Sequence, residues 1–257
     1  MKTSKYQAIK ADENGFFHYS KENNSVWQQL IMRQLPMIED VAYQPILDNI
    51  RLLDLPLDRI PQHKEINEKL AKINGWAIEA VPAIIPFDDF FDLMSHKKFP
   101  VATFIRTQED FDYIEEPDIF HEVFGHCHLL PNQSIAHFSE FFGVIGKEAT
   151  SEQRKYLSRL WWWTVEFGMI KHRQEKKIYG AGILSGPKET QFAMSNNQQC
   201  IEFDLEKVLR TAYRIDLVQP SYFTITDFTL FDELRKIDLL SYIEKIKHKT
   251  DFILNYE

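Results

Sequence analysis

Apolar residues recur at helical spacing along much of the chain, and this pattern predicts a mainly helical protein. Helices are predicted over residues 25–55, 62–75, 88–94 and 231–252. In the first, Trp27, Leu30 and Ile31 share one face, and Pro36 predicts a break. Thr150 and Gln153 form a capping-box pattern that predicts the start of a further long helix.

Extended and irregular segments are fewer and shorter. Strands are predicted at 99–105 and within 213–227, around Pro220. The prolines of 76–87 favour an extended or loop path along one wall of a pocket. Residues 1–20 look irregular, and 179–187 reads as a loop or tight turn. The predicted fold is therefore mainly α with a few short β-strands (α+β).

Composition and charge narrow the class of protein. With 257 residues, 44% of them hydrophobic, and no repeat or Gly/Ser linker, residues 1–257 are expected to form a single domain with one core. The net charge of −8 argues against nucleic acid and anionic membranes as partners. We find neither a signal-peptide pattern nor a run of 18 apolar residues, so we expect a cytoplasmic protein. Cys127 and Cys200 make no disulfide framework, and Cys127 is expected to be a small buried apolar residue.

Candidate chemistry is concentrated in residues 117–131, PDIFHEVFGHCHLLP, which hold three of the nine histidines. Neutral imidazole is the commonest protein metal ligand. Downstream, Glu166 stands in LWWWTVEFGMI, where an ionised carboxylate needs a cationic partner. Two histidines and one carboxylate form the facial triad typical of non-haem Fe(II) oxygenases. Spacing alone leaves Glu140 as an alternative third ligand, and satisfied core or surface histidines as the alternative to a metal site.

The spacing of the first two histidines distinguishes this segment from a zinc-protease helix. His121 and His126 lie five apart in HEVFGH, whereas the zinc motif H-E-x-x-H places them four apart. Five residues rotate a side chain by about 140° in an α-helix, so both cannot face one metal from a regular helix. We predict a helix that begins near Asp118 as N-cap and ends or distorts near Gly125. A zinc hydrolase with Glu122 as general base is disfavoured by this spacing and by the lack of an obvious third zinc ligand.

Three separated motifs resemble one known family. PDIFHEVFGHCHLL resembles the iron-binding signature of the aromatic amino acid hydroxylases, which are pterin-dependent monooxygenases. WWWTVEFGMI and YGAGILS resemble that family's downstream segments, in the same order. Within the family, IRTQEDFDYIEEPDIFHEVFGHC resembles the bacterial phenylalanine 4-hydroxylases. The resemblance covers roughly residues 25–230 and implies a catalytic domain without regulatory or tetramerisation domains, and hence a monomer.

The resemblance implies an iron site and a pterin site. His121, His126 and Glu166 match the iron ligands. Glu122 matches a glutamate of the pterin pocket, although a first-turn carboxylate stabilised by the helix dipole would give the same pattern. Phe90 matches the aromatic residue that stacks on the pterin ring, with a plain core role as the alternative.

It also implies an amino-acid site. Arg106 matches the arginine that clamps the substrate carboxylate, a role that suits a guanidinium fork. Asp118 would hold this arginine, although an N-cap role alone fits the sequence equally well. Trp162 matches an aromatic residue of the amino-acid pocket, with a core role as the alternative. Ser185 matches a serine near the amino-acid site, which orients a histidine that binds the metal.

The implied activity is ring hydroxylation of L-phenylalanine to L-tyrosine with Fe(II), a tetrahydropterin (tetrahydrobiopterin or a bacterial equivalent) and O₂, as in phenylalanine catabolism. Tryptophan hydroxylation stays open, because apolar contacts reject near-isosteric substrates poorly. A non-catalytic module that retains the fold is a further alternative. Two residues depart from the family pattern: His128 replaces a usual proline and is expected to point away from iron, and Ile114 replaces a threonine of the animal phenylalanine enzymes.

Overall fold

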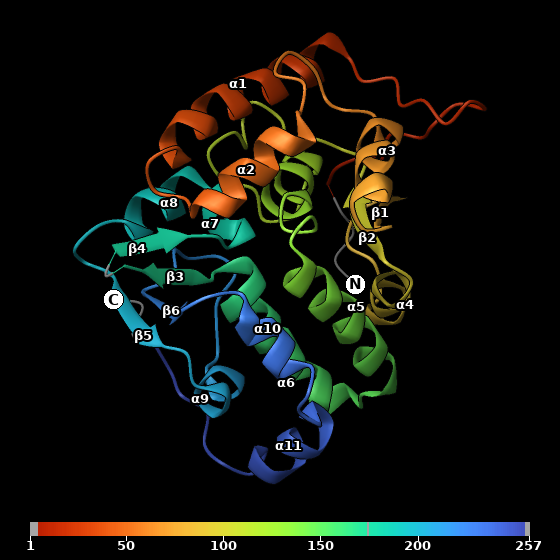
Figure 1. The fold of residues 1–257 in the computed structure, drawn as a ribbon. Coiled ribbons are helices and arrows are strands. Elements are labelled where there is room, and N and C mark those ends of the chain that lie inside the picture. Colours follow the sequence, from red (N-terminus) through yellow and green to blue (C-terminus); the bar gives the residue numbers. More distant parts are fainter. Residues whose placement is uncertain (1–4, 174, 255–257) are drawn as a thin grey trace.

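The computed structural model describes residues 5–173 and 175–254, and it is mainly helical with short strands in two small sheets (Figure 1). The predicted fold class is confirmed. Residues 5–20 are irregular, as predicted, apart from an isolated bridge between Ala11 and Phe17. The first four residues of the predicted irregular segment lie outside the described residues.

The N-terminal half of the chain supplies four helices (Figure 1). Their bounds are α1 Lys21–Ile38, α2 Gln44–Leu53, α3 His63–Ile73 and α4 Phe87–Ser95. The helices predicted at 62–75 and 88–94 are confirmed as α3 and α4. The break predicted at Pro36 is wrong: Pro36 lies inside the last turn of α1, and the chain turns only after Ile38. The missing N–H of proline removes only one hydrogen bond of the helix. The helix continues past Pro36 because the buried Ile38 packs against the core.

A two-stranded parallel sheet forms the pocket side of this half. It pairs β1 Ala77–Val81 with β2 Lys98–Ala102. The extended path predicted for 76–87 therefore begins as a strand and continues as a loop into α4. The strand predicted at 99–105 is confirmed, although it ends at Ala102.

A four-stranded sheet lies at the other side of the molecule (Figure 1). Its strands are β3 Met169–His172, β4 Glu175–Ile178, β5 Gln199–Glu202 and β6 Ser221–Ile225, in the order β4-β3-β6-β5. β3 and β4 are antiparallel, and the other two pairings are parallel. Of the strands predicted around Pro220, only the one after it forms, because residues 213–220 make a loop.

The remaining helices build the centre and the C-terminal side. They are α5 Gln133–Glu148, α6 Ser151–Trp161, α7 Ala181–Ser185, α8 Pro187–Ala193, α9 Leu205–Arg210, α10 Thr229–Leu234 and α11 Leu239–Ile246. The capping box of Thr150 and Gln153 at the start of α6 is confirmed. The closing helix predicted at 231–252 is instead the two short helices α10 and α11.

The loop predicted at 179–187 is wrong, because this segment is largely helical, forming α7 and the start of α8. The glycines of this segment allow it to pack closely against neighbouring residues. A Cβ at Gly180 would overlap the backbone carbonyl of Glu166, and one at Gly182 would crowd the ring of Phe167. Pro187 is the first residue of α8, a position where proline is favoured.

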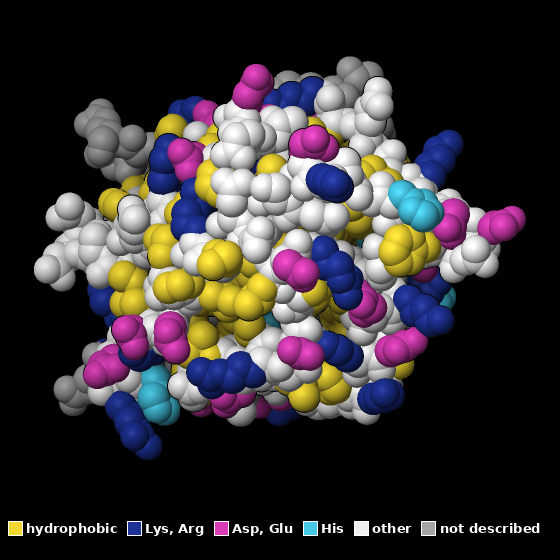
Figure 2. Space-filling model, turned by 90° about the horizontal axis from the view of Figure 1, so that it is seen from above, with side chains coloured by type: hydrophobic (Ala, Val, Ile, Leu, Met, Phe, Trp, Pro, Cys, Tyr) yellow, Lys and Arg dark blue, Asp and Glu magenta, His cyan; other side chains and the backbone are white. Residues whose placement is uncertain are grey.

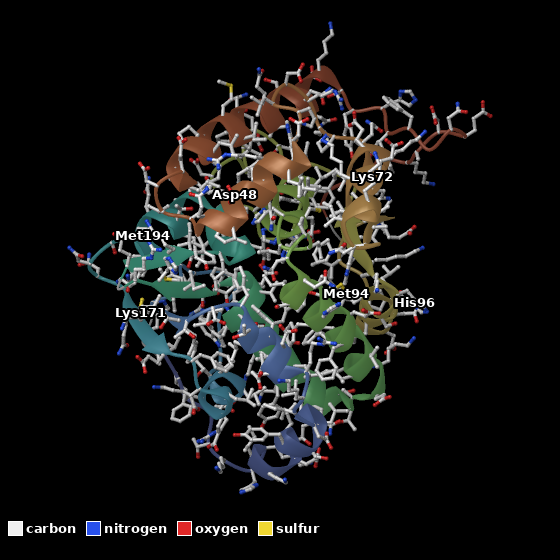
Figure 3. All side chains as sticks on the ribbon, in the orientation of Figure 1. Asp48, Lys72, Met94, His96, Lys171 and Met194 are labelled. Carbon is white, nitrogen blue, oxygen red and sulfur yellow. The ribbon has the colours of Figure 1, made fainter. Side chains whose placement is uncertain are left out.

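Helices α4 and α5 pack closely beside the pocket. A Cβ at Gly143 of α5 would overlap the backbone between Met94 and Ser95 of α4. Met94 is fully buried, and Figure 3 shows it between these helices while His96 lies at the outer edge. The ring of Phe91 from α4 packs at 5.5 Å from that of Phe142 of α5.

Charged side chains of both signs lie on the surface. On the face shown in Figure 2, basic and acidic side chains are interspersed around hydrophobic ones, without an extended basic area. Among the helices within residues 5–173 and 175–254, none has the length and apolar character needed to cross a membrane. Cys127 is buried, as predicted.

Candidate active site

A π-helix resolves the five-residue spacing of the two histidines. The helical backbone starts at Ile119 and takes π geometry over His121–Cys127, the element η1. In a π-helix the hydrogen bonds run from residue i to i+5, so a step of five residues is about one turn. His121 and His126 therefore lie on one face, and their Nε2 atoms are 3.2 Å apart. The predicted start near Asp118 is confirmed, because its carboxylate accepts from the His121 backbone N–H at 3.0 Å.

The distortion predicted near Gly125 is confirmed, because this residue lies inside the π-helical segment His121–Cys127. The helix does not end at Gly125, and its φ is not positive. A Cβ at this position would lie 2.9 Å from the carbonyl oxygen of Ala181. Gly125 is therefore needed for the close approach of η1 to α7, which brings Ser185 to His121.

Glu166 reaches the same point from a second π-helical turn. Helix α6 passes directly into the π-helix η2, Trp162–Glu166, closed by a bond from the Phe167 N–H to the Trp162 carbonyl at 2.9 Å. Trp161 lies five residues before Glu166 and donates its indole N–H to Glu166 Oε1 at 3.3 Å. The tryptophan-rich segment thus supplies a direct partner for the buried carboxylate.

Three side chains form a candidate metal site. The ligand atoms of His121, His126 and Glu166 all lie within 4.8 Å of one another. Glu166 Oε1 is 2.8 Å from His126 Nε2, and Oε2 is 3.6 Å from His121 Nε2. Ligand atoms about 2.1 Å from a metal and at right angles to each other lie about 3 Å apart. The residues fit one octahedral metal ion held on one face.

The charges of these groups favour a cation. Burial raises the pKa of Glu166, but the charge and hydrogen bond of His126, together with His121 and Trp161, outweigh this effect and lower the value to about 2. Burial, helped by His126, lowers the pKa of His121 to about 4, so this imidazole is neutral. Burial lowers the pKa of His126, but the charge and hydrogen bond of Glu166, together with the charge of Glu122, outweigh it and raise the value. The site therefore combines an anionic oxygen with a neutral imidazole at His121, and a metal would take the place of the proton on His126 Nε2. This donor set suits Fe(II).

Ser185 fixes the orientation of one ligand. Its Oγ donates to the Ala181 carbonyl at 2.8 Å and lies 2.8 Å from His121 Nδ1. With its own hydrogen directed at Ala181, the hydroxyl accepts from the His121 Nδ1–H. This tautomer leaves the lone pair on Nε2 facing His126 and Glu166, which is the orienting role expected for Ser185.

The metal site lies on a cavity of about 270 Å³. Its walls are mostly aromatic and aliphatic, and its carboxylates are Glu122 and Glu166. Phe90 lines it and packs edge-on against Trp161 at 6.1 Å. Burial raises the pKa of Glu122 to about 8, so a protonated carboxyl group faces the cavity near neutral pH. The residues expected for the pterin, Phe90 and Glu122, are thus brought together beside the metal site.

Arg106 and Asp118 form a buried ion pair behind this cavity. The Nε and Nη2 of Arg106 donate to the two carboxylate oxygens of Asp118 at 2.8 and 2.9 Å, and both residues are buried. Asp118 therefore has both roles considered from the sequence, holding the arginine and capping the helix. Neither residue lines the cavity itself, whereas the adjacent Pro117 does. Within the described residues Arg106 Nη1 makes no hydrogen bond, so the two N–H groups of this nitrogen remain available.

Other candidates from the sequence lie outside the metal site. Glu140 on α5 pairs with Lys97 at 3.6 Å and does not join the ligand group. His128 is buried, and burial lowers its pKa to about 3, so it is a neutral core imidazole whose ring packs edge-on against Phe124 at 6.4 Å. Ile114 is not among the residues that line the cavity.

Two residues of the site were missed in the sequence. Trp161 donates to Glu166, and its spacing of five from that residue repeats the spacing of the two histidines, which was a usable signal. Tyr213 lines the cavity and stacks on Trp162, with ring centroids 4.1 Å apart and planes 10° apart. Tyr213 is distant in sequence from every motif, so no local pattern identifies it.

Comparison with known proteins agrees with this geometry. The sequence model described as biopterin-dependent aromatic amino acid hydroxylase matches residues 5–257. The chain belongs to this family. A phenylalanine-4-hydroxylase of Pseudomonas aeruginosa is 47% identical over 245 residues, which cover 95% of this chain and 94% of that protein.

Solved structures of family members share the fold. The apo structure of the cold-active phenylalanine hydroxylase from Colwellia psychrerythraea matches with a TM-score of 0.94 and 44% identity, covering 97% of each chain. The Chromobacterium violaceum phenylalanine hydroxylase with bound oxidised Fe(III) matches with a TM-score of 0.89 and 34% identity, covering 95% of this chain and 92% of that one. The described residues are thus a catalytic domain of the biopterin-dependent hydroxylase type.

Proposed function

We propose that this chain hydroxylates the ring of L-phenylalanine to L-tyrosine, with Fe(II) as cofactor and a tetrahydropterin and O₂ as co-substrates. The observation that carries the proposal is the convergence of His121, His126 and Glu166 beside an aromatic cavity. The 47% identity to a phenylalanine-4-hydroxylase supports the choice of substrate.

The protein would hold the iron with these three side chains and leave the remaining coordination positions open. When bound, iron and pterin supply the oxygen activation and the two electrons that amino-acid side chains cannot supply. Ser185 keeps the proton of His121 on Nδ1, so that Nε2 is free to bind metal. The aromatic walls exclude water from the reacting groups.

The organic substrates would be positioned by the other residues of the site. Phe90 is proposed to stack on the pterin, and Glu122, protonated near neutral pH, can donate a hydrogen bond to the pterin ring. Arg106 is proposed to bind the amino-acid carboxylate, since Asp118 takes only two of its three guanidinium nitrogens. Trp162 is proposed to form one wall of the amino-acid pocket.

We also propose that small molecules are the only partners and that the protein is a cytoplasmic monomer. The net charge of −8 supports the first point, because it disfavours nucleic acid. Size-exclusion chromatography and cell fractionation test the other two.

Product analysis tests the proposed reaction. Purified protein loaded with Fe(II) receives a tetrahydropterin, O₂ and either phenylalanine or tryptophan, with metal-free protein as control. We expect tyrosine to form only with iron and pterin, and faster than hydroxytryptophan. Preferential formation of hydroxytryptophan would contradict the substrate assignment, and no product from iron-containing protein would contradict the reaction.

A further inference from the structure

Gln219 lies outside the cavity but contacts its wall. It is 1% exposed, and its Oε1 accepts from the indole Nε1–H of Trp162 at a long 3.4 Å. Its Nε2 donates to the carbonyls of Arg214 at 2.7 Å and Leu217 at 2.8 Å. Both hydrogens of the amide nitrogen thus point at loop carbonyls, which leaves the amide oxygen for Trp162 and fixes the orientation of the group.

The same side chain holds the loop that carries Tyr213. Residues 214–218 are all exposed, and such loops open at low free energy unless they are tied down. Tyr213, at the start of this loop, must nevertheless stay stacked on Trp162 at 4.1 Å. The two hydrogen bonds from Gln219 to the carbonyls of Arg214 and Leu217 tie the exposed loop to the buried Gln219 side chain.

Gln219 is itself connected to helix α8 and strand β6. The backbone N–H of Gln219 donates to Glu189 Oε1 at 3.0 Å, and the hydroxyl of Tyr222 donates to the same oxygen at 2.6 Å. Glu189 lies on α8 and Tyr222 on β6, and both are buried. Gln219 is therefore connected to rigid elements on one side and to Trp162 and Tyr213 on the other.

We infer that Gln219 is a positioning residue for the amino-acid pocket, which it shapes by fixing the Trp162–Tyr213 wall. The inference rests on the proposed function, because it takes Trp162 as part of the phenylalanine site. Loss of the amide would free the indole and the loop together, so the ring of the substrate would be held less firmly before the metal. Phenylalanine binding would weaken, while the pterin side of the cavity, built on α4 and η1, would keep its shape.

The test compares Gln219→Leu with Gln198→Leu. Gln198 is also a buried glutamine, 7% exposed, whose Nε2 donates to a backbone carbonyl, that of Ala193, away from the cavity. In iron-loaded protein without O₂, we expect calorimetry to show phenylalanine binding about tenfold weaker for Gln219→Leu, equivalent to roughly 1.4 kcal/mol. Gln198→Leu should bind within about twofold of wild type. With O₂ and pterin, Gln219→Leu should also form less tyrosine per pterin oxidised, a ratio that partial unfolding does not change.

A double-mutant cycle with Trp162→Phe identifies the route of the effect. If Gln219 acts through Trp162, Gln219→Leu should weaken phenylalanine binding much less in the Trp162→Phe background than in wild type. Effects on the dissociation constant that multiply to within about twofold would overturn the inference. So would equal phenylalanine binding by Gln219→Leu and Gln198→Leu.

Gln219→Glu is a second variant, which tests the inference if Gln219→Leu does not fold. The glutamate keeps an oxygen that can accept from Trp162, but its second oxygen faces the two loop carbonyls and cannot donate to them. We therefore expect this variant also to bind phenylalanine more weakly. Binding like that of wild type would overturn the role of the hydrogen bonds to the loop. If wild-type protein neither binds nor hydroxylates phenylalanine, the proposed function fails and the inference falls with it. If wild type does both and the Gln219 variants match it, the inference alone fails.

Discussion

Glu166 is the residue on which the candidate metal site most depends, because it is the only carboxylate of the ligand group found within the described residues. Burial raises the pKa of this carboxyl group, yet its hydrogen bond to His126 at 2.8 Å and that from Trp161 at 3.3 Å stabilise the anion. Its negative charge in a buried setting is compensated fully only when a cation is bound.

Glu166→Ala should therefore abolish tight iron binding while leaving the protein folded, because the two histidines remain but the anionic oxygen is lost. Iron per protein after loading and dialysis, together with circular dichroism, measures both effects. Glu140→Ala is the matched control, since Glu140 pairs with Lys97 and was the rival ligand from spacing alone. Wild-type iron content in Glu166→Ala, or loss of iron in Glu140→Ala, would contradict the triad.

Single residues of the site were predictable to the extent that their chemistry is local. Two histidines with a downstream glutamate among tryptophans predict a metal site from residue type alone, and the family resemblance selected Glu166 over Glu140. Tyr213 and Gln219 could not be predicted, because their roles arise from a loop that folds back on Trp162 from a distant part of the chain.

At the scale of elements, the site is built on two π-helical turns, η1 and η2. Each places residues five apart on one face: His121 with His126, and Trp161 with Glu166. The sequence showed that a regular α-helix cannot do this, but it did not specify the alternative. At Gly125 this element also approaches α7 closely, a tertiary contact that no local pattern reveals.

Other elements were mispredicted for similar reasons. The glycines of 179–187 suggested a loop, whereas Gly180 and Gly182 permit close contacts of a helix with Glu166 and Phe167. Pro36 suggested a helix end, but the buried face of α1 extends past it to Ile38. Tertiary packing thus decided the structure where local propensity pointed elsewhere.

The contact between α4 and α5 should be sensitive to one added methyl group. Gly143→Ala should lower the free energy of unfolding by about 1–3 kcal/mol, because its Cβ would overlap the backbone of Met94 and Ser95, which cannot yield as a side chain can. In an exposed helix position the same change would stabilise by about 1 kcal/mol. Urea denaturation measures the difference, with the exposed Val144→Ala of the same helix expected within about 0.5 kcal/mol of wild type. A stabilised Gly143→Ala would contradict this packing.

At the scale of the whole molecule, the cavity draws on the two-stranded sheet and on helices from both halves of the chain. The cavity takes residues from β1, β2, α4, η1 and η2, and a buried network joins α8 and β6 to the loop at Tyr213. The network contains the carboxyl group of Glu189, whose raised pKa makes the stability of the protein depend on pH.

Burial raises the pKa of Glu189 to about 7, against an ordinary value of 4.5, although Tyr222 and the Gln219 N–H act in the opposite direction. Between these values the folded protein holds more protons than the unfolded chain. The contribution of Glu189 to stability is therefore full at acidic pH and is lost as the pH rises from about 4.5 to about 7. The shift corresponds to up to about 3 kcal/mol.

Comparison of wild type with Glu189→Gln by urea denaturation isolates this effect, because glutamine keeps an acceptor oxygen but does not titrate. We expect the stability of wild type relative to Glu189→Gln to fall as the pH rises from 4.5 to 7. A difference that stays constant, or that grows with pH, would show that folding does not raise the pKa of Glu189.

The position of iron tests the central claim most directly. Crystals of the protein loaded with Fe(II) without O₂ would be measured at the iron absorption edge. The account predicts one strong anomalous peak about 2.1 Å from Nε2 of His121, Nε2 of His126 and a carboxylate oxygen of Glu166. Iron bound elsewhere, or no iron in a protein that forms tyrosine with pterin, would contradict it.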